Sequence, residues 1–236
     1  MLSKEEFKRY QKQVMVDDIG INGQIKIKQS KVAVIGAGGL GCPVLQYLTS
    51  VGVGTIGVID FDTVEISNLH RQTLYTTEDV GKPKVDIAIQ KLSRQNPFIT
   101  LISHPVLLNE ENAESILSQY DIVVDGCDNF LTRYVVNDMC VKLNKSLVYG
   151  SILNYEGQLA VFNYKGSKNL RDLFPEPPNS EDVPGCSDNG VLGTVPGIIG
   201  TMMAQETINV IMDKPSLINT LGIYSTDTFK LKRLSY

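Results

Sequence analysis

The stretch Lys31–Gly41, KVAVIGAGGLG, decides the fold that we expect for this chain. Its first half is a run of small and β-branched apolar residues, which is typical of a strand buried in a parallel sheet. Its second half fits the pattern G-x-G-x-x-G and supplies Gly36, Gly38, Gly39 and Gly41. Between a strand and a helix that we expect to reach Val51, these glycines let a phosphate approach backbone N–H groups at the positive end of the helix. The stretch therefore predicts a nucleotide site, with a plain tight turn as the alternative.

Strands and helices alternate on both sides of this stretch. We expect further buried strands at Thr55–Ile59, Phe98–Ser103, Asp121–Asp125 and Ser146–Tyr149, and helices at Pro83–Gln95, Glu110–Ser118 and Phe130–Leu143. Two short helices, a capped one from Ser3 to Val14 and another over Ile21–Lys28, precede the first strand. This alternation predicts an α/β fold with a Rossmann-like, mostly parallel sheet flanked by helices.

The pattern changes after residue 150. We expect a strand at Gln158–Tyr164, a loop over Arg171–Gly185, a long apolar helix at Val195–Met212 and a final hairpin made of Leu217–Tyr224 and Thr228–Leu234. These C-terminal strands are expected to be antiparallel. Because the chain shows no repeat and no linker-like segment, we expect residues 1–236 to form a single domain. Its parts would be N-terminal helices 1–30, a nucleotide-binding core 31–150 and a third part 151–236.

The composition is that of a soluble globular protein. Apolar residues make up 42% of the 236 positions and charged residues 20%. A net charge of −4 argues against the basic surface of a nucleic-acid binder. No apolar run approaches the roughly 20 residues of a membrane span, and the first ten residues lack a signal-peptide core, so we expect a cytoplasmic protein that does not bind membranes. The four cysteines form no C-x-x-C pair, and Cys42 and Cys140 are expected to be ordinary buried residues.

Three charged residues downstream of the glycine turn indicate which nucleotide it binds. Asp60 closes the second strand, where a carboxylate would bond ribose hydroxyls, and alone it would suit an NAD-dependent oxidoreductase. Arg71 and Lys84 change that interpretation. Cations near the phosphates are needed when negative charge builds up during attack on an α-phosphate, but not during hydride transfer. Together these residues favour a triphosphate site over two solvated surface cations.

The segment Asp125–Asn129, DGCDN, follows the fourth expected strand. It lies at the carboxyl edge of the sheet, where ligands bind in open α/β folds. Asp128 is a candidate Mg²⁺ ligand, since such sites use one or two carboxylates together with phosphate oxygens. Asp128 or Asn129 could also cap the next helix. Cys127 is expected to be a small buried residue rather than a nucleophile.

Six motifs follow one another along nearly the whole chain. They are RYQKQ at residues 9–13, VIGAGGLGCPVLQYLTSVGVG at 34–54, DFDTVEISNLHRQ at 60–72, VGKPK at 80–84, DGCDN at 125–129 and CSDNGVLGTVPGIIGTMMAQE at 186–206. This ordered set resembles the ThiF/MoeB/HesA family, the bacterial relatives of ubiquitin-activating enzymes. The resemblance implies an adenylyltransferase that uses ATP and Mg²⁺. Its substrate would be the C-terminal glycine carboxylate of a ubiquitin-like sulfur carrier ending in Gly-Gly, of the ThiS or MoaD type, and the third part of the chain would bind this carrier.

The resemblance also implies roles for individual residues. Gly39 would lie in the nucleotide loop, Asp60 would bind the ribose, Lys84 would contact the triphosphate, and Asp128 would be linked to Mg²⁺ with Asn129 beside it. ATP would be lined by Ser67, Asn68, Leu69, His70 and Arg71, of which Asn68 and Arg71 would lie near the phosphates.

Lys12 is expected to act from the partner subunit. Family members are homodimers in which a basic residue of an RYxRQ motif reaches the partner's ATP, and that motif here is Arg9-Tyr10-Gln11-Lys12-Gln13. Lysine keeps the charge of the usual arginine but lacks its bidentate geometry, which weakens the expectation.

Two cysteine positions bear on the pathway. Cys186 stands where ThiF-type members have a cysteine that takes part in sulfur transfer, which would add a sulfurtransferase or cysteine desulfurase as a partner, whereas MoeB-type members keep one without a clear need. Many relatives hold a structural zinc with two C-x-x-C pairs. This chain has Asn169-Leu170-Arg171-Asp172 at the first pair, and the second would lie beyond the final hairpin, so we expect no zinc. The sequence does not identify the carrier, but these features favour the thiamine branch over molybdenum cofactor synthesis.

Two other functions are compatible with parts of the sequence. A nicotinamide-dependent oxidoreductase would explain the glycine turn and Asp60, but it would leave Arg71, Lys84 and Asp128 without a role. The same set of charged residues argues against a non-catalytic adaptor that docks a carrier protein. The replacement of the usual arginine by Lys12 slightly favours such an adaptor.

Overall fold

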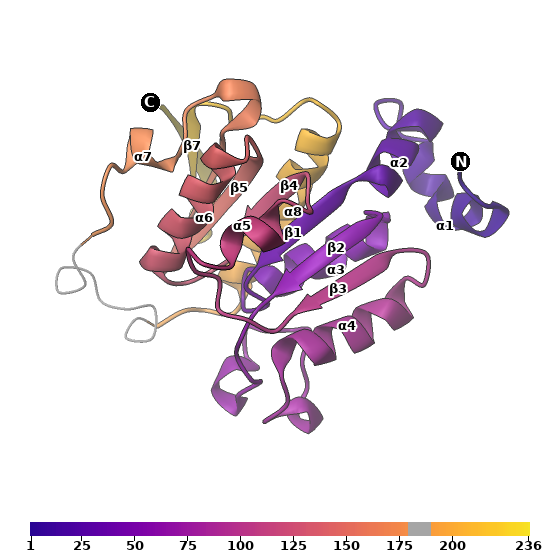
Figure 1. The fold of residues 1–236 in the computed structure, drawn as a ribbon, viewed down its shortest axis with the longest axis horizontal. Coiled ribbons are helices and arrows are strands. Elements are labelled where there is room, and N and C mark those ends of the chain that lie inside the picture. The colour runs from indigo at the N-terminus through magenta and orange to yellow at the C-terminus, as the bar shows by residue number, and fades with distance from the viewer. Residues whose placement is uncertain (179–189) are drawn as a thin grey trace.

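Eight strands form one mixed sheet in the computed structural model, which describes residues 1–178 and 190–236 (Figure 1). They are β1 Lys31–Ile35, β2 Thr55–Ile59, β3 Thr100–His104, β4 Ile122–Asp125, β5 Ser146–Leu153, β6 Glu156–Phe162, β7 Thr220–Ser225 and β8 Lys230–Ser235. Their order across the sheet is β3-β2-β1-β4-β5-β6-β7-β8. Neighbours from β3 to β5 are parallel, and those from β5 to β8 are antiparallel. The expected parallel sheet with antiparallel C-terminal strands is confirmed.

Helices cover both faces of this sheet. They are α1 Lys4–Val14, α2 Gly20–Gln29, α3 Gly41–Val51, α4 Lys84–Gln95, α5 Ala113–Leu117, α6 Phe130–Lys142, α7 Leu170–Leu173 and α8 Thr194–Ile211. The core on one face joins α3, α4 and α8 to Val32 and Val34 of β1, and the core on the other face joins α5 and α6 to Ala33 and Ile35. Successive strand residues point to opposite faces, so a continuous apolar strand such as β1 is buried on both sides.

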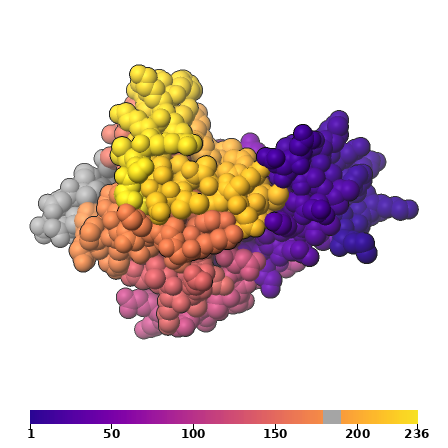
Figure 2. Space-filling model, turned by 90° about the horizontal axis from the view of Figure 1, so that it is seen from above, coloured from indigo at the N-terminus to yellow at the C-terminus, as the bar shows by residue number. Residues whose placement is uncertain are grey.

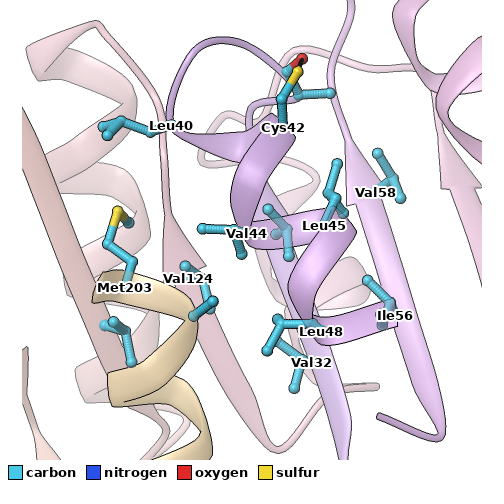
Figure 3. Packing of buried hydrophobic residues seen from close by; sticks show 14 of the residues in the cluster. Val32, Leu40, Cys42, Val44, Leu45, Leu48, Ile56, Val58, Val124 and Met203 are labelled. Carbon is cyan, nitrogen blue, oxygen red and sulfur yellow. Dashed lines mark hydrogen bonds between the residues drawn. The ribbon is translucent and has the colours of Figure 1, made fainter. Parts of the chain in front are cut away.

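Helix α3 supplies the apolar side chains next to the glycine turn. Val44, Leu45 and Leu48 are fully buried, and they pack with Val32 of β1 and Ile56 of β2 (Figure 3). Removing one of these side chains would leave a cavity that typically costs about 2–5 kcal/mol. The helix that begins at the turn is therefore held rigidly against the sheet.

The N-terminal helices lie at the end of the sheet where β1 begins (Figure 1). Helix α1 starts with the expected capping box between Ser3 and Glu6. Its Tyr10 is buried against Gly52 at the end of α3, and the Tyr10 hydroxyl accepts a hydrogen bond of 2.8 Å from Asn96. These helices project from one side of the molecule and the C-terminal hairpin from another (Figure 2). Tyr10 contacts the end of α3, whereas the glycine turn lies at its start. The 11 residues of α3, about 16 Å long, therefore separate α1 from the glycine turn.

The boundary between β5 and β6 differs from the expected one. β5 continues to Leu153 instead of ending at Tyr149, because it pairs with β6 through a tight turn. Asn154 in that turn has φ 53°, a left-handed conformation that asparagine tolerates better than most residues. The strand was predicted from the apolar run that ends at Tyr149, and this run gives no indication of the turn.

Among the other boundaries that differ, such as those of α5 and β6, two have a clear local reason. The strand expected from residue 98 begins at Thr100, because Phe98 N–H donates to the side chain of Asn96 at 3.2 Å and is held in a turn. The loop expected over 171–185 instead includes most of α7, whose capping box joins Asn169 and Asp172. Residues 179–185 of that loop lie outside the described part.

The helices of residues 1–178 and 190–236 include none that is both long and apolar enough to cross a membrane. Cys42 of α3 and Cys140 of α6 are buried, as expected. Burial raises the pKa of both thiols, that of Cys42 to about 12, so neither is ionised near neutral pH.

Candidate functional site

The glycine turn joins β1 to α3 at the carboxyl edge of the parallel strands. Gly36 has φ 85°, in the left-handed region that favours glycine, and its N–H donates to the Ile59 carbonyl at 2.8 Å. A Cβ on Gly41 would overlap the Gly36 carbonyl oxygen, and one on Gly39 would lie 3.2 Å from Pro196 of α8. The turn is thus a narrow backbone cradle at a helix N-terminus, which suits a phosphate group.

Asp60 follows β2 and holds the turn in place. Its Oδ2 accepts a hydrogen bond from Ala37 N–H at 2.7 Å, and its Oδ1 accepts one from Asp62 N–H at 2.8 Å. Burial raises the pKa of this carboxyl group, while the positive charge of Lys84 and the two N–H donors oppose the rise. Each carboxylate oxygen has a second lone pair, so Asp60 can brace the turn and still accept a bond from a ligand hydroxyl.

Lys84 is the first residue of α4 and brings its ammonium group to the same place. Its Nζ lies 2.8 Å from Asp62 Oδ2, and its side chain is only 6% exposed. The Tyr75 hydroxyl donates to the Ala37 carbonyl at 2.9 Å and lies 3.4 Å from the Lys84 carbonyl, which links the start of α4 to the glycine turn. Asp60 and Lys84, which are 24 positions apart in the sequence, are therefore brought together at the turn.

Segment 67–72 brings Arg71 to the glycine turn. The Arg71 Cδ lies 3.7 Å from where a Cβ on Gly39 would be, and its Nη1 donates to the Ser67 carbonyl at 3.3 Å. Gly193, just before α8, packs closely against the His70 carbonyl. Ser67 and His70 are exposed, and Asn68 and Leu69 are half-buried. Arg71 thus brings a second cation, besides Lys84, to the glycine turn, on the side of α8.

Gln72 is a site residue that the sequence interpretation missed. Its side chain is buried, and its Nε2 lies 3.6 Å from where a Cβ on Gly38 would be. Its Oε1 has no hydrogen-bond partner among the described residues. A buried polar atom without a partner costs about 1–3 kcal/mol, which a ligand or a water at this position would relieve. The signal in the sequence was its place beside Arg71, as the last residue of the motif at 60–72.

The loop after β4 lies beside the glycine turn. A Cβ on Gly36 would lie 2.9 Å from the Gly126 carbonyl oxygen. Asp128 in this loop is exposed, and Asn129, not Asp128, caps α6 by accepting from Thr132 N–H at 2.8 Å. Within residues 1–178 and 190–236, no three His, Cys, Asp or Glu side chains form a group that could hold a metal. Asp128 is thus a single carboxylate, which would hold Mg²⁺ only together with phosphate oxygens.

A buried arginine, also missed, fixes this loop. The Arg133 Nε lies 3.1 Å from Asp125 Oδ2, and its Nη2 donates to the carbonyls of Cys127 at 2.8 Å and Gly150 at 3.1 Å. Its guanidinium group also lies over the Tyr149 ring, 4.7 Å from the centroid. Since Arg133 lies in an expected helix with no motif around it, no pattern in the sequence singled it out.

The structure places the backbone of Cys127 beside the turn and the helix that carries Lys12 far from it (Figure 1). Cys127 is half-buried instead of buried, and burial together with Asp125 raises the pKa of its thiol well above the usual value, which disfavours the thiolate. Lys12 is exposed on α1, at the opposite end of the sheet from the glycine turn of its own chain. Cys186 lies outside the described residues.

Known proteins are similar over most of the chain. A family model described as the ThiF family matches residues 10–236. The sulfur carrier protein adenylyltransferase of Thermus thermophilus is 48% identical over 215 residues, which cover 89% of this chain and 79% of that protein. The adenylyltransferase and sulfurtransferase MOCS3 of Culex quinquefasciatus is 49% identical over 218 residues, which cover 92% of this chain and 50% of that protein. This chain therefore spans about half the length of the MOCS3 relative.

A solved structure supports the fold. The crystal structure of PaaA has a TM-score of 0.84 and covers 99% of this chain and 74% of its own. Its sequence identity is 23%, so the likeness concerns the arrangement of helices and strands alone.

Proposed function

Because this chain belongs to the ThiF family, we propose that it uses ATP to adenylate the C-terminal glycine carboxylate of a ubiquitin-like sulfur-carrier protein. The observation that carries the proposal is the meeting of Asp60, Lys84 and Arg71 around the glycine turn. A relative with 48% identity, whose name states this activity, supports the same substrate class. Residues 1–236 would form one adenylyltransferase domain.

The residues around the turn fit a nucleoside triphosphate. The cradle of Gly36 to Gly41 admits phosphate oxygens close to backbone N–H groups, and Gln72 offers a buried amide oxygen that lacks a partner among residues 1–178 and 190–236. Asp60 would accept from a ribose hydroxyl. Lys84 and Arg71 would contact the phosphates, with Asn68 at their side and Ser67, Leu69 and His70 lining the nucleotide.

Asp128 would hold Mg²⁺ together with phosphate oxygens, and Asn129 would keep the loop in place as the cap of α6. When bound, the metal supplies positive charge to the phosphates. The protein contributes the position of that carboxylate, which the Arg133–Asp125 ion pair and the bond from Arg133 to the Cys127 carbonyl hold beside the turn.

The chemistry needs charge and position more than a protein base. The carrier's terminal carboxylate is already ionised at neutral pH. Its oxygen would attack the α-phosphorus of ATP and form a new P–O bond. The bond from that phosphorus to the bridging oxygen would break, and pyrophosphate would leave with the electron pair, giving an acyl-adenylate. Lys84 and Arg71 would stabilise the negative charge that develops on the phosphoryl oxygens.

A second copy of the chain would complete the site. Lys12 lies at the far end of the sheet from its own glycine turn, so it can reach a nucleotide only in another subunit. This separation supports a homodimer in which Lys12 acts on the partner's ATP. In a symmetric dimer both sites would receive the same lysine.

The pathway and the sulfur step are narrower proposals. We infer that the carrier ends in Gly-Gly and serves either the thiamine thiazole or the molybdenum cofactor, with zinc absent and the thiamine branch favoured. Cys186 would act after adenylation, in sulfur transfer with a sulfurtransferase or a cysteine desulfurase. We also infer a cytoplasmic location, where ATP for the adenylation step is available.

ATP–pyrophosphate exchange tests the main proposal. The purified chain is incubated with ATP, Mg²⁺, labelled pyrophosphate and a ThiS- or MoaD-like carrier, and label is expected to enter ATP only when the carrier has its terminal Gly-Gly. A carrier that lacks the last two glycines is the matched control. No exchange with either type of carrier, or tight NAD binding without ATP binding, would overturn the proposal.

A further inference from the structure

Lys84 is held at both ends by one residue, Asp62. The Lys84 ammonium lies 2.8 Å from Asp62 Oδ2, and the Lys84 backbone N–H donates to the Asp62 carbonyl at 2.9 Å. Asp62 is itself held, because its N–H donates to Asp60 Oδ1 at 2.8 Å. Since Asp60 Oδ2 accepts from Ala37 N–H, a continuous chain of hydrogen bonds runs from Lys84 to the glycine turn.

The backbone on both sides of this contact is paired as well. Val64 N–H donates to the Lys82 carbonyl at 2.9 Å, and Gly81 N–H donates to the Val64 carbonyl at 2.8 Å. Thr63 and Pro83 form an antiparallel bridge between the Val64–Lys82 bond and the bond from Lys84 N–H to the Asp62 carbonyl. The segments that carry Asp62 and Lys84 therefore cannot slide past each other without breaking several backbone hydrogen bonds.

The contact differs from an ordinary surface ion pair. The Lys84 side chain is 6% exposed, whereas the side chain of Asp62 is 48% exposed. In the exposed pair of Lys142 and Glu114 the two values are 58% and 53%, and such pairs contribute little. A buried ammonium, in contrast, needs a charged partner, because it has lost most of its water.

We propose that Asp62 is a positioning residue for Lys84, an inference that rests on the proposed function. Asp62 fixes the direction of the ammonium group and does not contact the nucleotide. An ammonium group has three N–H donors, so one can stay on Asp62 while two meet phosphate oxygens. Lysine has a flexible four-carbon stem, and a cation held in place before the reaction stabilises developing charge better than a mobile one.

The inference predicts a split between rate and binding. In Asp62→Ala, the single-turnover rate of adenylate formation is expected to fall about tenfold, because Lys84 loses its fixed direction. The Kd for ATP is expected to stay within about threefold, because removing a nearby negative charge offsets the looser lysine. Asp62→Asn keeps a side-chain oxygen as acceptor and is expected to recover part of the rate.

Two further variants separate positioning from general damage. Asp86→Asn removes an exposed carboxylate from the same first turn of α4, and it is expected to leave the rate unchanged. Lys84→Gln removes the group through which Asp62 would act. In that background Asp62→Ala is expected to cause no further loss of single-turnover rate. Such non-additive losses are expected when one residue acts only through the other.

Three results would overturn the inference. They are an unchanged rate in Asp62→Ala, an equal tenfold loss in the Lys84→Gln background, and a parallel loss of affinity for ATP and for adenosine, which would mean that the glycine turn itself is damaged. Failure of the proposed function is distinct, because the wild-type chain would then form no adenylate with any carrier, and the inference would fall with it.

Discussion

Arg133 and Asp125 form a buried ion pair beside the glycine turn, with 7% and 0% of their side chains exposed. The pair joins α6 to the end of β4, and Arg133 continues from it to the carbonyls of Cys127 and Gly150. The loop that carries Asp128 is therefore held by one guanidinium group. The position of this exposed loop thus depends on a buried residue.

Removing one partner of this pair is expected to be strongly destabilising. Arg133→Met leaves the Asp125 carboxylate buried without its charged partner, with only the bond from Cys127 N–H at 3.0 Å remaining, which costs about 3–5 kcal/mol of the free energy of unfolding. Arg171→Met is the matched control, since Arg171 and Asp138 form a pair that is 40% and 49% exposed and its loss is expected to cost about 1 kcal/mol or less. Urea denaturation of both variants measures the difference, and equal losses would contradict the prediction.

The glycine at position 41 is expected to be irreplaceable by alanine. A Cβ there would overlap the Gly36 carbonyl oxygen, so Gly41→Ala must distort the turn and weaken ATP binding about tenfold or more. Gly197→Ala in α8 is the control, because a Cβ there meets nothing within 4 Å and alanine favours a helix by about 0.5–1 kcal/mol. Calorimetric titration with ATP and thermal melts would show the contrast. ATP affinity unchanged in Gly41→Ala would refute it.

Substitutions of the charged residues near the turn and of Cys186 are expected to affect different steps, namely adenylation and sulfur transfer. Arg71→Ala and Asp128→Ala are expected to lower ATP–pyrophosphate exchange by roughly 100-fold or more, since Arg71 would balance the charge of the phosphates and Asp128 would hold the Mg²⁺ that does the same. Cys186→Ala is expected to leave exchange intact. Arg94→Ala removes an exposed arginine from α4 and serves as the control. If Cys186→Ala abolished exchange, the division between the two steps would be wrong.

Lys12 is expected to act only across subunits. Lys12→Ala and Lys84→Ala are each expected to be inactive in exchange. After the two variants are unfolded and refolded together, about a quarter of the wild-type activity is expected, because half of the dimers are mixed and each has one complete site. Activity that stays at the level of the separate variants would count against a contribution in trans.

Asp79 predicts a stability difference that depends on pH. Burial acts to raise the pKa of its carboxyl group, but bonds from Lys91 and Thr76 outweigh burial and lower the pKa to about 2. A lowered folded-state pKa stabilises the fold above the unfolded value of about 3.9 and loses that effect as the pH falls toward 2. Asp79→Asn is therefore expected to be about 2 kcal/mol less stable at pH 7 but nearly equal to the wild type near pH 2. Urea midpoints across this range measure it, and a constant difference would contradict the cause.

Most of the fold could be predicted because its signals are local. The apolar run of β1, the glycines before α3 and the capping box of α1 depend on neighbours in the sequence. The boundary of β5 could not be predicted in the same way, since its last four residues are strand only because β6 pairs with them. The helical turn α7 was missed because its capping box is short and lies in a segment rich in proline.

The sequence by itself determined the order of elements, the nucleotide turn and the charges around it, because strand burial, helix capping and left-handed glycines are properties of short segments. Only the tertiary structure decided which groups meet. It placed Lys84 on Asp62, buried Arg133 against Asp125, left the Gln72 oxygen without a partner in the described part of the chain and put Lys12 at the far end of the sheet. Such contacts join residues that are distant in the sequence, and they depend on desolvation and packing, for which a linear motif carries no signal.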